Sequence, residues 1–179
     1  MKIILINVSS LDGRFTKWNG SNIYEWSSRE DFDFFKKTMS ENNLIIMGSG
    51  TFDKVRTNKK AGLKPEKERL RIVMTKNPEN YKKFEVPGQL EFSNETPKKL
   101  IKRLEKQGYK QALLVGGGKI ANSFFTDKLI DEVWLTIEPR IFGEGKVLAE
   151  GRRLDISLNL ISTKRLNAKG TLLLKYKVL

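Results

Sequence analysis

The sequence predicts a three-layer α/β/α fold, with a mostly parallel central sheet and an antiparallel hairpin at the C-terminal end. Three observations lead to this prediction. Short apolar runs alternate with helix-like segments between residues 2 and 137, as in βαβ units. Residues 2–8 (KIILINV) are mostly apolar, which is typical of a central strand buried on both faces. Two long strand-like runs then end the chain around a turn at residues 167–170.

The other elements are predicted from capping residues and apolar runs. Ser28 lies just before acidic residues, so we expect it to cap a helix that runs to about Ser40. Thr96 and Pro97 open another helix, which ends near Gln107. Further strands are expected at residues 44–47, 71–75, 90–93, 111–115, 132–137, 154–165 and 171–178, with short helices after residue 51 and at 119–125. Residues 9–24 are predicted to form a long loop over a site, and residues 57–69 an exposed connection.

Length and composition indicate one domain, 1–179. The chain has no internal repeat and no linker that would separate a second domain. No apolar run approaches the roughly 18 residues that a membrane-spanning helix needs, so we expect no membrane partner. The first strand lacks the charged lead and cleavage site of a signal peptide, which favours a cytoplasmic protein.

The chain contains neither cysteine nor histidine, which shortens the list of chemistries. Disulfides, thiolate nucleophiles, Ser-His triads and most transition-metal sites are excluded, and we expect no metal. Acid or base chemistry must come from carboxylates, Lys or Tyr. The net charge of +13 would attract nucleic acid, anionic membranes or small anions such as nucleotides, and the alternative is a basic surface that only keeps the protein soluble. Lys and Arg are spread along the chain, so we expect no specific nucleic-acid partner.

Two glycine-rich turns are candidates for binding a dinucleotide. The first lies between a strand and a helix and consists of Val115, Gly116, Gly117, Gly118 and Lys119. Free N–H groups at the start of that helix can bind a pyrophosphate. A second strand ends in Gly48, Ser49, Gly50 and Thr51. Two such turns at the carboxyl edge of one sheet can hold a dinucleotide from both sides, although a tight turn without a ligand is the alternative for each. Thr75 and Lys76 end a third strand there and could hold a ribose or its 2′-phosphate, although a Lys just after a strand is usually only a solvated charge.

Asp31 is the candidate catalytic residue. It precedes Phe32 by one position and Phe35 by four, so its carboxyl group could lie beside an apolar wall. Burial there would hold its proton near neutral pH, and the group could donate to a ring nitrogen while a hydride arrives. The alternative is that Asp31 only stabilises the positive start of the helix.

These motifs resemble the dihydrofolate reductase-like superfamily, and within it the reductase domain of riboflavin biosynthesis. Residues 10–14 (SLDGR) are similar to the S-L-D-G-[KR] signature of the superfamily, and residues 47–52 (MGSGTF) to its G-x-x-T turn. Residues 114–145 resemble the riboflavin-type pattern of paired glycines, then D-E, then P-x-x-x-G-x-G. Residues 26–36 (WSSREDFDFFK) resemble the dihydrofolate reductase segment W-x-x-x-x-D-L-x-x-F-K, which places Asp31 at the substrate-binding carboxylate.

The resemblance implies NADPH as the hydride donor and a homodimer formed through the late strands. It places the pyrophosphate at residues 116–120, further phosphate contacts near Gly50 and Thr51, and the 2′-phosphate near Thr75 and Lys76. We accordingly expect Val8 and Ile120 to join the cofactor site, and Asn7, Asp12, Phe32 and Phe35 to contact the substrate.

The sequence therefore predicts an NADPH-dependent reductase of a small anionic or heterocyclic substrate. The segment 139–145 and the final hairpin favour 5-amino-6-(5-phosphoribosylamino)uracil reductase activity, with hydride transfer to a sugar carbon. Residues 52–55 (FDKV) stand where riboflavin reductases carry D-D-P, which favours the alternative, reduction of a pterin C=N bond. A third hypothesis is a nucleotide-binding or nucleic-acid-binding module without turnover.

Overall fold

The computed structural model describes residues 1–20, 23–57, 67–148 and 153–179. Its strands are β1 (Lys2–Ser10), β2 (Leu44–Gly48), β3 (Leu70–Met74), β4 (Leu90–Ser93), β5 (Gln111–Val115), β6 (Glu132–Glu138), β7 (Leu158–Arg165) and β8 (Leu172–Val178). Its α-helices are α1 (Arg29–Ser40), α2 (Ser49–Arg56), α3 (Pro97–Lys106) and α4 (Gly118–Thr126), and two 3-10 helices cover Ile23–Glu25 and Pro78–Phe84.

All eight strands form one sheet in the order β4-β3-β2-β5-β1-β6-β8-β7. Strands β1 to β6 run parallel, and β8 and β7 add an antiparallel hairpin at one edge. The predicted mostly parallel sheet with a C-terminal hairpin is therefore confirmed. Strand β1 lies inside the sheet between β5 and β6, as its apolar sequence predicts.

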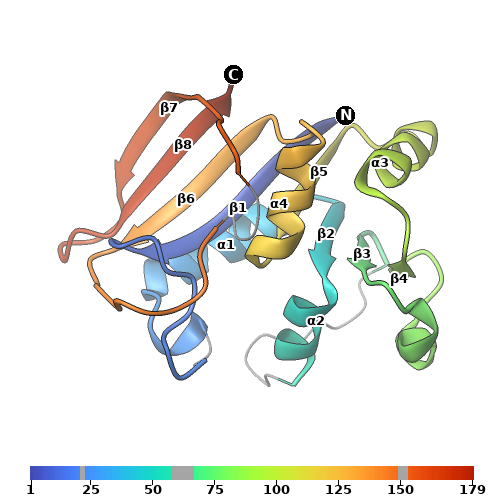
Figure 1. Cartoon of the computed structure of the whole chain (residues 1–179), viewed down its shortest axis with the longest axis horizontal. Helices are drawn as coiled ribbons and strands as arrows, with labels where there is room; N and C mark the ends of the chain where they lie inside the picture. Colours follow the sequence, from blue (N-terminus) through green and yellow to red (C-terminus); the bar gives the residue numbers. More distant parts are fainter. Residues whose placement is uncertain (21–22, 58–66, 149–152) are drawn as a thin grey trace.

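Helices cover both faces of the sheet and complete the three layers. Figure 1 shows α4 in front of the sheet and α1 behind it. Alternate residues of β1 serve the two faces, because successive side chains of a strand point in opposite directions. Ile3 packs with Leu100 of α3 and Phe124 of α4, whereas Ile4 belongs to the layer of Phe52 and the half-buried Phe35. Each such fully buried side chain contributes roughly 1.5–3 kcal/mol through burial.

Most element boundaries agree with the sequence, and the differences have physical reasons. Ser28 and Thr96 cap α1 and α3 as predicted, each accepting a hydrogen bond from the backbone N–H three residues later. Strand β1 continues to Ser10, because Ser10 pairs with Glu138 of β6. Strand β7 begins at Leu158, four residues later than predicted, where pairing with Val178 begins. Most of the predicted connection at 57–69 lies outside the described residues.

The loop after β1 is joined to the segment after β6 by backbone hydrogen bonds. Leu11 N–H donates to the Arg140 carbonyl at 2.7 Å, and Phe15 N–H donates to the Lys146 carbonyl at 2.7 Å. Gly145 lies where the two segments are closest: its φ is +144°, and an ideal Cβ would lie 1.8 Å from the Thr16 carbonyl oxygen. Only glycine fits there, so the pattern at residues 139–145 reflects this close approach.

We predict that Gly145→Ala destabilises the folded protein by about 1–3 kcal/mol, because the added methyl group must push the two segments apart. The control is Gly50→Ala in α2, where a Cβ meets no atom within 4 Å and the change should be neutral or stabilising. Urea unfolding measures both variants. Equal stability of the two would contradict the close approach at Gly145.

Candidate active site

The two glycine-rich turns meet at the carboxyl edge of the sheet. Strand β2 pairs directly with β5, with Met47 opposite Val115, so the chain leaves the two strands side by side. Gly116 has a φ of +143°, and an ideal Cβ on it would lie 2.9 Å from the Thr51 hydroxyl oxygen. The structure thus brings together the two turns that the sequence singles out.

Asn7 of β1 fixes the first turn from the other side. Its side-chain amide donates a hydrogen bond to the Gly116 carbonyl at 2.9 Å. This contact orients the peptide that leads into α4. The sequence suggests Asn7 as a substrate contact, and the structure shows that it also supports the turn.

The start of α4 offers backbone donors to a ligand. Gly117 is the N-cap residue, no side chain caps the helix, and a Cβ on Gly117 would meet no atom within 4 Å. Gly117 and Lys119 are exposed, whereas Gly118 and Ile120 are buried. A Cβ on Gly118 would lie 2.5 Å from the Val147 carbonyl oxygen, so this glycine admits the neighbouring backbone. The N–H groups of a helix start that no side chain caps favour an anion.

The remaining predicted cofactor residues lie on the same edge. Met74 of β3 pairs with Gly48, so Thr75 and Lys76 follow directly beside the second turn. Lys76 is exposed, and the Thr75 hydroxyl accepts a hydrogen bond from Asn77 N–H at 3.3 Å. The Ser49 side chain hydrogen-bonds the Tyr81 hydroxyl. Val8 is buried and pairs with Thr136 of β6, the residue whose side chain hydrogen-bonds Asp31.

Asp31 is buried at the start of α1, with 7% of its surface exposed. Its carboxyl group hydrogen-bonds the side chains of Thr136 and Ser27. Burial first, and then the nearby negative charge of Glu138, raise the pKa of Asp31 from 3.8 to about 6, against the lowering effect of the Thr136 and Ser27 hydrogen bonds. Asp31 therefore holds its proton in a fraction of the molecules near neutral pH, which is what the sequence predicts from the neighbouring phenylalanines. Phe32 and Phe35 are half-buried, and Phe32 contacts Tyr24 edge to face at 5.6 Å between ring centroids.

Sequence reasoning missed Thr136 and Glu138, which lie two positions apart on β6. Both are almost fully buried. Apart from Glu132 at its start, the other residues of β6 are apolar, and that contrast is the signal that could have singled out Thr136 and Glu138. Glu138 borders a polar hollow of about 460 Å³, whose lining is Trp26, Ser27, Ser28, Glu138, Pro139, Arg140, Asn167, Lys169 and Thr171.

Asp12 anchors the loop after β1. Its carboxylate accepts hydrogen bonds from Phe142 N–H at 3.1 Å and Gly143 N–H at 2.8 Å, and from the Ser10 hydroxyl at 2.5 Å. The Ser10 hydroxyl, followed by the two backbone donors, lowers the pKa of Asp12 to about 2. Asp12 is therefore ionised at neutral pH and ties the loop to the segment after β6.

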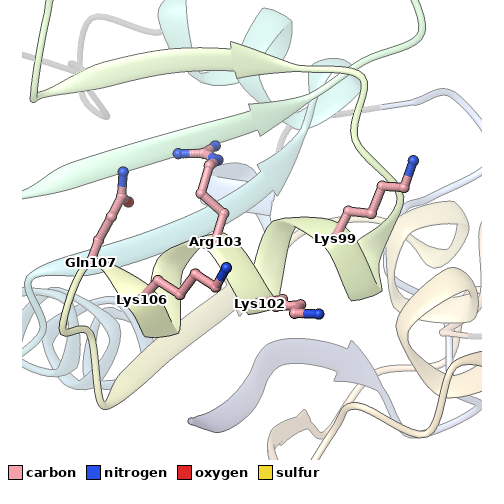
Figure 2. A pocket seen from close by; sticks show the side chains of 5 residues that line it. All are labelled: Lys99, Lys102, Arg103, Lys106 and Gln107. Atoms are coloured by element: carbon pink, nitrogen blue, oxygen red, sulfur yellow. The ribbon is translucent and has the colours of Figure 1, made fainter.

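A second hollow, of about 390 Å³, lies on α3 and is lined by Lys99, Lys102, Arg103, Lys106 and Gln107. Figure 2 shows that all five side chains come from this helix and the residue after it. Arg103 is already paired with Glu91 and Glu95. The hollow is a charged helix surface apart from the glycine turns, and we do not assign the active site to it. Among the described residues, no helix is long and apolar enough to cross a membrane.

We predict that Asp31→Asn stabilises the folded protein at neutral pH. The folded state binds the Asp31 proton more tightly than the unfolded state, because the pKa rises from 3.8 to about 6 on folding. The ionised carboxylate therefore costs about 3 kcal/mol of folding free energy above pH 6, and this cost disappears as the pH falls from 6 to below 4.

Urea unfolding at neutral pH and near pH 4 measures this effect. Asp31→Asn should be more stable than the parent protein at neutral pH, and the gain should shrink on acidification. Asp33→Asn, at an exposed carboxylate of the same helix, is the control and should change little at either pH. A gain that does not depend on pH would rule out the buried, ionisable carboxyl group.

Comparison with known proteins supports one family. The chain is 26% identical over 168 residues to the uncharacterized protein YwjB of Bacillus subtilis (strain 168), covering 92% of this chain and 91% of that protein. It is 27% identical over 167 residues to the uncharacterized protein YyaP of the same strain, covering 91% and 88% of the two chains.

Three solved structures show the same fold. A putative riboflavin biosynthesis protein from Shewanella sp. PV-4 matches with a TM-score of 0.81 and 22% identity over 100% of this chain and 99% of its own. A deaminase/5-amino-6-(5-phosphoribosylamino)uracil reductase from Thermotoga maritima matches with a TM-score of 0.77 and 16% identity over 99% of this chain and 56% of its own. Dihydrofolate reductase from Enterococcus faecalis, complexed with NADP(H), matches with a TM-score of 0.64 and 17% identity over 99% and 96%.

The predicted dihydrofolate reductase-like fold is thus confirmed. The family model described as the RibD C-terminal domain matches residues 1–172, nearly the whole chain. The chain belongs to the RibD C-terminal domain family.

Proposed function

We propose that this protein is an NADPH-dependent reductase of a small heterocyclic substrate. The observation that carries the proposal is that two glycine turns meet at the carboxyl edge of the sheet, to which Asp31 is joined by its hydrogen bond with Thr136 of β6. In open α/β sheets, ligands bind outside the carboxyl ends of the strands. Family membership and the NADP(H)-bound reductase among the similar structures support the same reaction class.

The residues present fit a dinucleotide phosphate. The start of α4 has no side-chain cap, and a Cβ on Gly117 or Gly50 would meet no atom within 4 Å, so the space in front of both turns is open. We assign the pyrophosphate to residues 116–120, further phosphate contacts to residues 48–51, and the 2′-phosphate to Thr75 and Lys76. NADPH, when bound, supplies a hydride. An enzyme that draws on NADPH is expected to work in the cytoplasm, where that donor is supplied.

Asp31 supplies the proton that must accompany the hydride. Its carboxyl group is held by Thr136 and Ser27, and its raised pKa keeps a protonated fraction near neutral pH. Phe32 and Phe35 provide an apolar wall for a heterocycle. We assign Asn7 to the substrate and Val8 to the cofactor, both in the carboxyl half of β1. Asp12 acts by positioning, because its carboxylate fixes the loop that flanks the site.

Two substrates fit this proton donor. In the riboflavin-type reaction the hydride adds to the sugar carbon of a phosphoribosylaminopyrimidine, the ring C–O bond breaks, and the ring oxygen takes the proton. The family and the net charge of +13 favour this substrate and its phosphate. In the pterin reaction a C=N bond takes the hydride on carbon and the proton on nitrogen. The Asp31–Thr136 pair favours this second candidate, because a buried neutral carboxyl group suits a ring nitrogen.

The exposed edge strand favours a homodimer as part of the same proposal. Strand β7 ends the sheet, and all eight of its residues are exposed. Leu158, Leu160 and Ile161 expose 43–52% of their surfaces. An exposed edge strand of this length that carries three apolar side chains favours pairing with a second copy of the chain.

We predict that saturating NADPH raises the thermal midpoint of unfolding by about 5–10 °C, because a ligand at 100 times its Kd stabilises the folded state by about 2.7 kcal/mol. Gly117→Asp should abolish this shift without destabilising the free protein, since Asp is a good N-cap but repels a pyrophosphate. Gly117→Ser fills the same space without charge and should keep most of the shift. No shift with NADPH for the parent protein would overturn the proposal and leave a module without turnover.

We also predict that the protein oxidises NADPH in the presence of a phosphoribosylaminopyrimidine, with dihydrofolate tested in parallel. Loss of NADPH absorbance measures the rate. Asp31→Asn should lower kcat by about 100-fold or more with either substrate, because a general acid contributes that much, and should leave NADPH binding unchanged. Full activity of this variant would remove Asp31 from the reaction.

A further inference from the structure

Glu138 is a buried carboxylate that neither the sequence motifs nor the proposed reaction uses. It ends β6 with 3% of its surface exposed. One of its oxygens accepts a hydrogen bond from Ser28 N–H at 2.7 Å, and the other accepts from the Thr171 hydroxyl at 2.8 Å. Both donors point at the carboxylate, and an ionised carboxylate is the form that accepts at both oxygens. A carboxylate so placed connects three elements of the fold.

Ser28 connects Glu138 to Asp31 by hydrogen bonds. Ser28 is the N-cap residue of α1, and its hydroxyl accepts the Asp31 N–H at 3.2 Å. Thr136 lies two residues before Glu138 and bonds the Asp31 side chain. Strand β6 therefore holds the first turn of α1 at two points, one at the backbone of the cap and one at the carboxyl group of Asp31.

The charge of Glu138 also acts on Asp31. Among the described residues, Tyr24 and Glu138 are the ionisable groups that interact with Asp31 from other elements, and Glu138 raises the pKa of Asp31 after the larger effect of burial. Arg140 and Lys169 line the hollow beside Glu138, but both are exposed to water. Water screens exposed charges far more than buried ones, so these two cations compensate little of the buried negative charge.

We propose that Glu138 is the positioning residue of this site: it ties the start of α1 to β6 and to the β7–β8 hairpin, and it sets a fixed negative charge beside Asp31. The effect of this charge on catalysis rests on the proposed function, in which Asp31 donates the proton. Without the charge, Asp31 would give up its proton at lower pH and fewer molecules would be ready to react at neutral pH.

Glu138→Gln separates the charge from the contacts. The glutamine oxygen can still accept from Ser28 N–H, and its amide can donate to the Thr171 hydroxyl oxygen. Glu30→Gln is the matched control, because it removes an exposed carboxylate from the residue next to Asp31. Glu138→Ala removes both the charge and the contacts, and Thr171→Val removes one contact while keeping the charge.

The first readout is the titration of Asp31 in the full chain without cofactor, followed by carboxyl ¹³C NMR and assigned with Asp31→Asn. Glu138→Gln should move the Asp31 midpoint to lower pH, and Glu30→Gln should leave it in place. An unchanged midpoint in Glu138→Gln overturns the electrostatic part. This readout does not need activity, so it tests the inference even if the proposed function fails.

The second readout is the pH profile of the reduction. In Glu138→Gln, kcat at about pH 7.5 should fall about three- to tenfold, since the protonated fraction falls tenfold for each unit that the pKa drops. Near pH 5 the variant should recover to within about twofold of the parent, with KM for NADPH unchanged throughout. Glu138→Ala should stay slow at both pH values, and if it does not fold, Thr171→Val serves as the test of the contacts. Parent-like activity of Glu138→Ala, or of Thr171→Val in its place, overturns the positioning role.

Discussion

The register of β1 between β5 and β6 is the constraint on which the candidate site depends. Pairing of Ile6 with Val115 sets Asn7 beside the turn that begins at Gly116. Pairing of Ser10 with Glu138 sets the loop after β1 against the segment after β6. A slip of one residue would turn every β1 side chain to the opposite face, so the buried alternation of Ile3, Ile4 and their successors protects the site geometry.

The site also contains an unfavourable arrangement that the fold must offset. Asp31 and Glu138 are both buried, and within the part of the chain that the structure describes no cation contributes to the pKa of Asp31. Burying a carboxylate is costly, and a second negative charge adds to the cost. This arrangement keeps a fraction of the Asp31 carboxyl groups protonated near neutral pH, which is what a general acid requires. Stability and proton donation are therefore in conflict at Asp31, as is common where activity needs a perturbed group.

Local signals allowed much of the fold to be predicted. Helix caps and glycine turns depend on residues that are close to them in the sequence. Ser28, Thr96 and the glycines where β2 and β5 end could therefore be recognised from the sequence. Family resemblance then placed Asp31, and the structure agrees with its expected burial. Contacts between distant residues could not be predicted: the Glu138–Thr171 hydrogen bond spans 33 positions and depends on the strand order. The same holds for Gly145, whose need for glycine arises from Thr16 across the loop pair.

The most direct test of this account is to follow the backbone amide resonances of the protein while NADP⁺ is added. The account predicts that the largest shifts fall on residues 48–51 and 116–120, the two adjoining turns that would both contact one bound dinucleotide, with a further shift at Lys76. Shifts confined to the basic face of α3 would contradict it, because they would show a nucleotide held by surface charge alone and not by the two glycine turns.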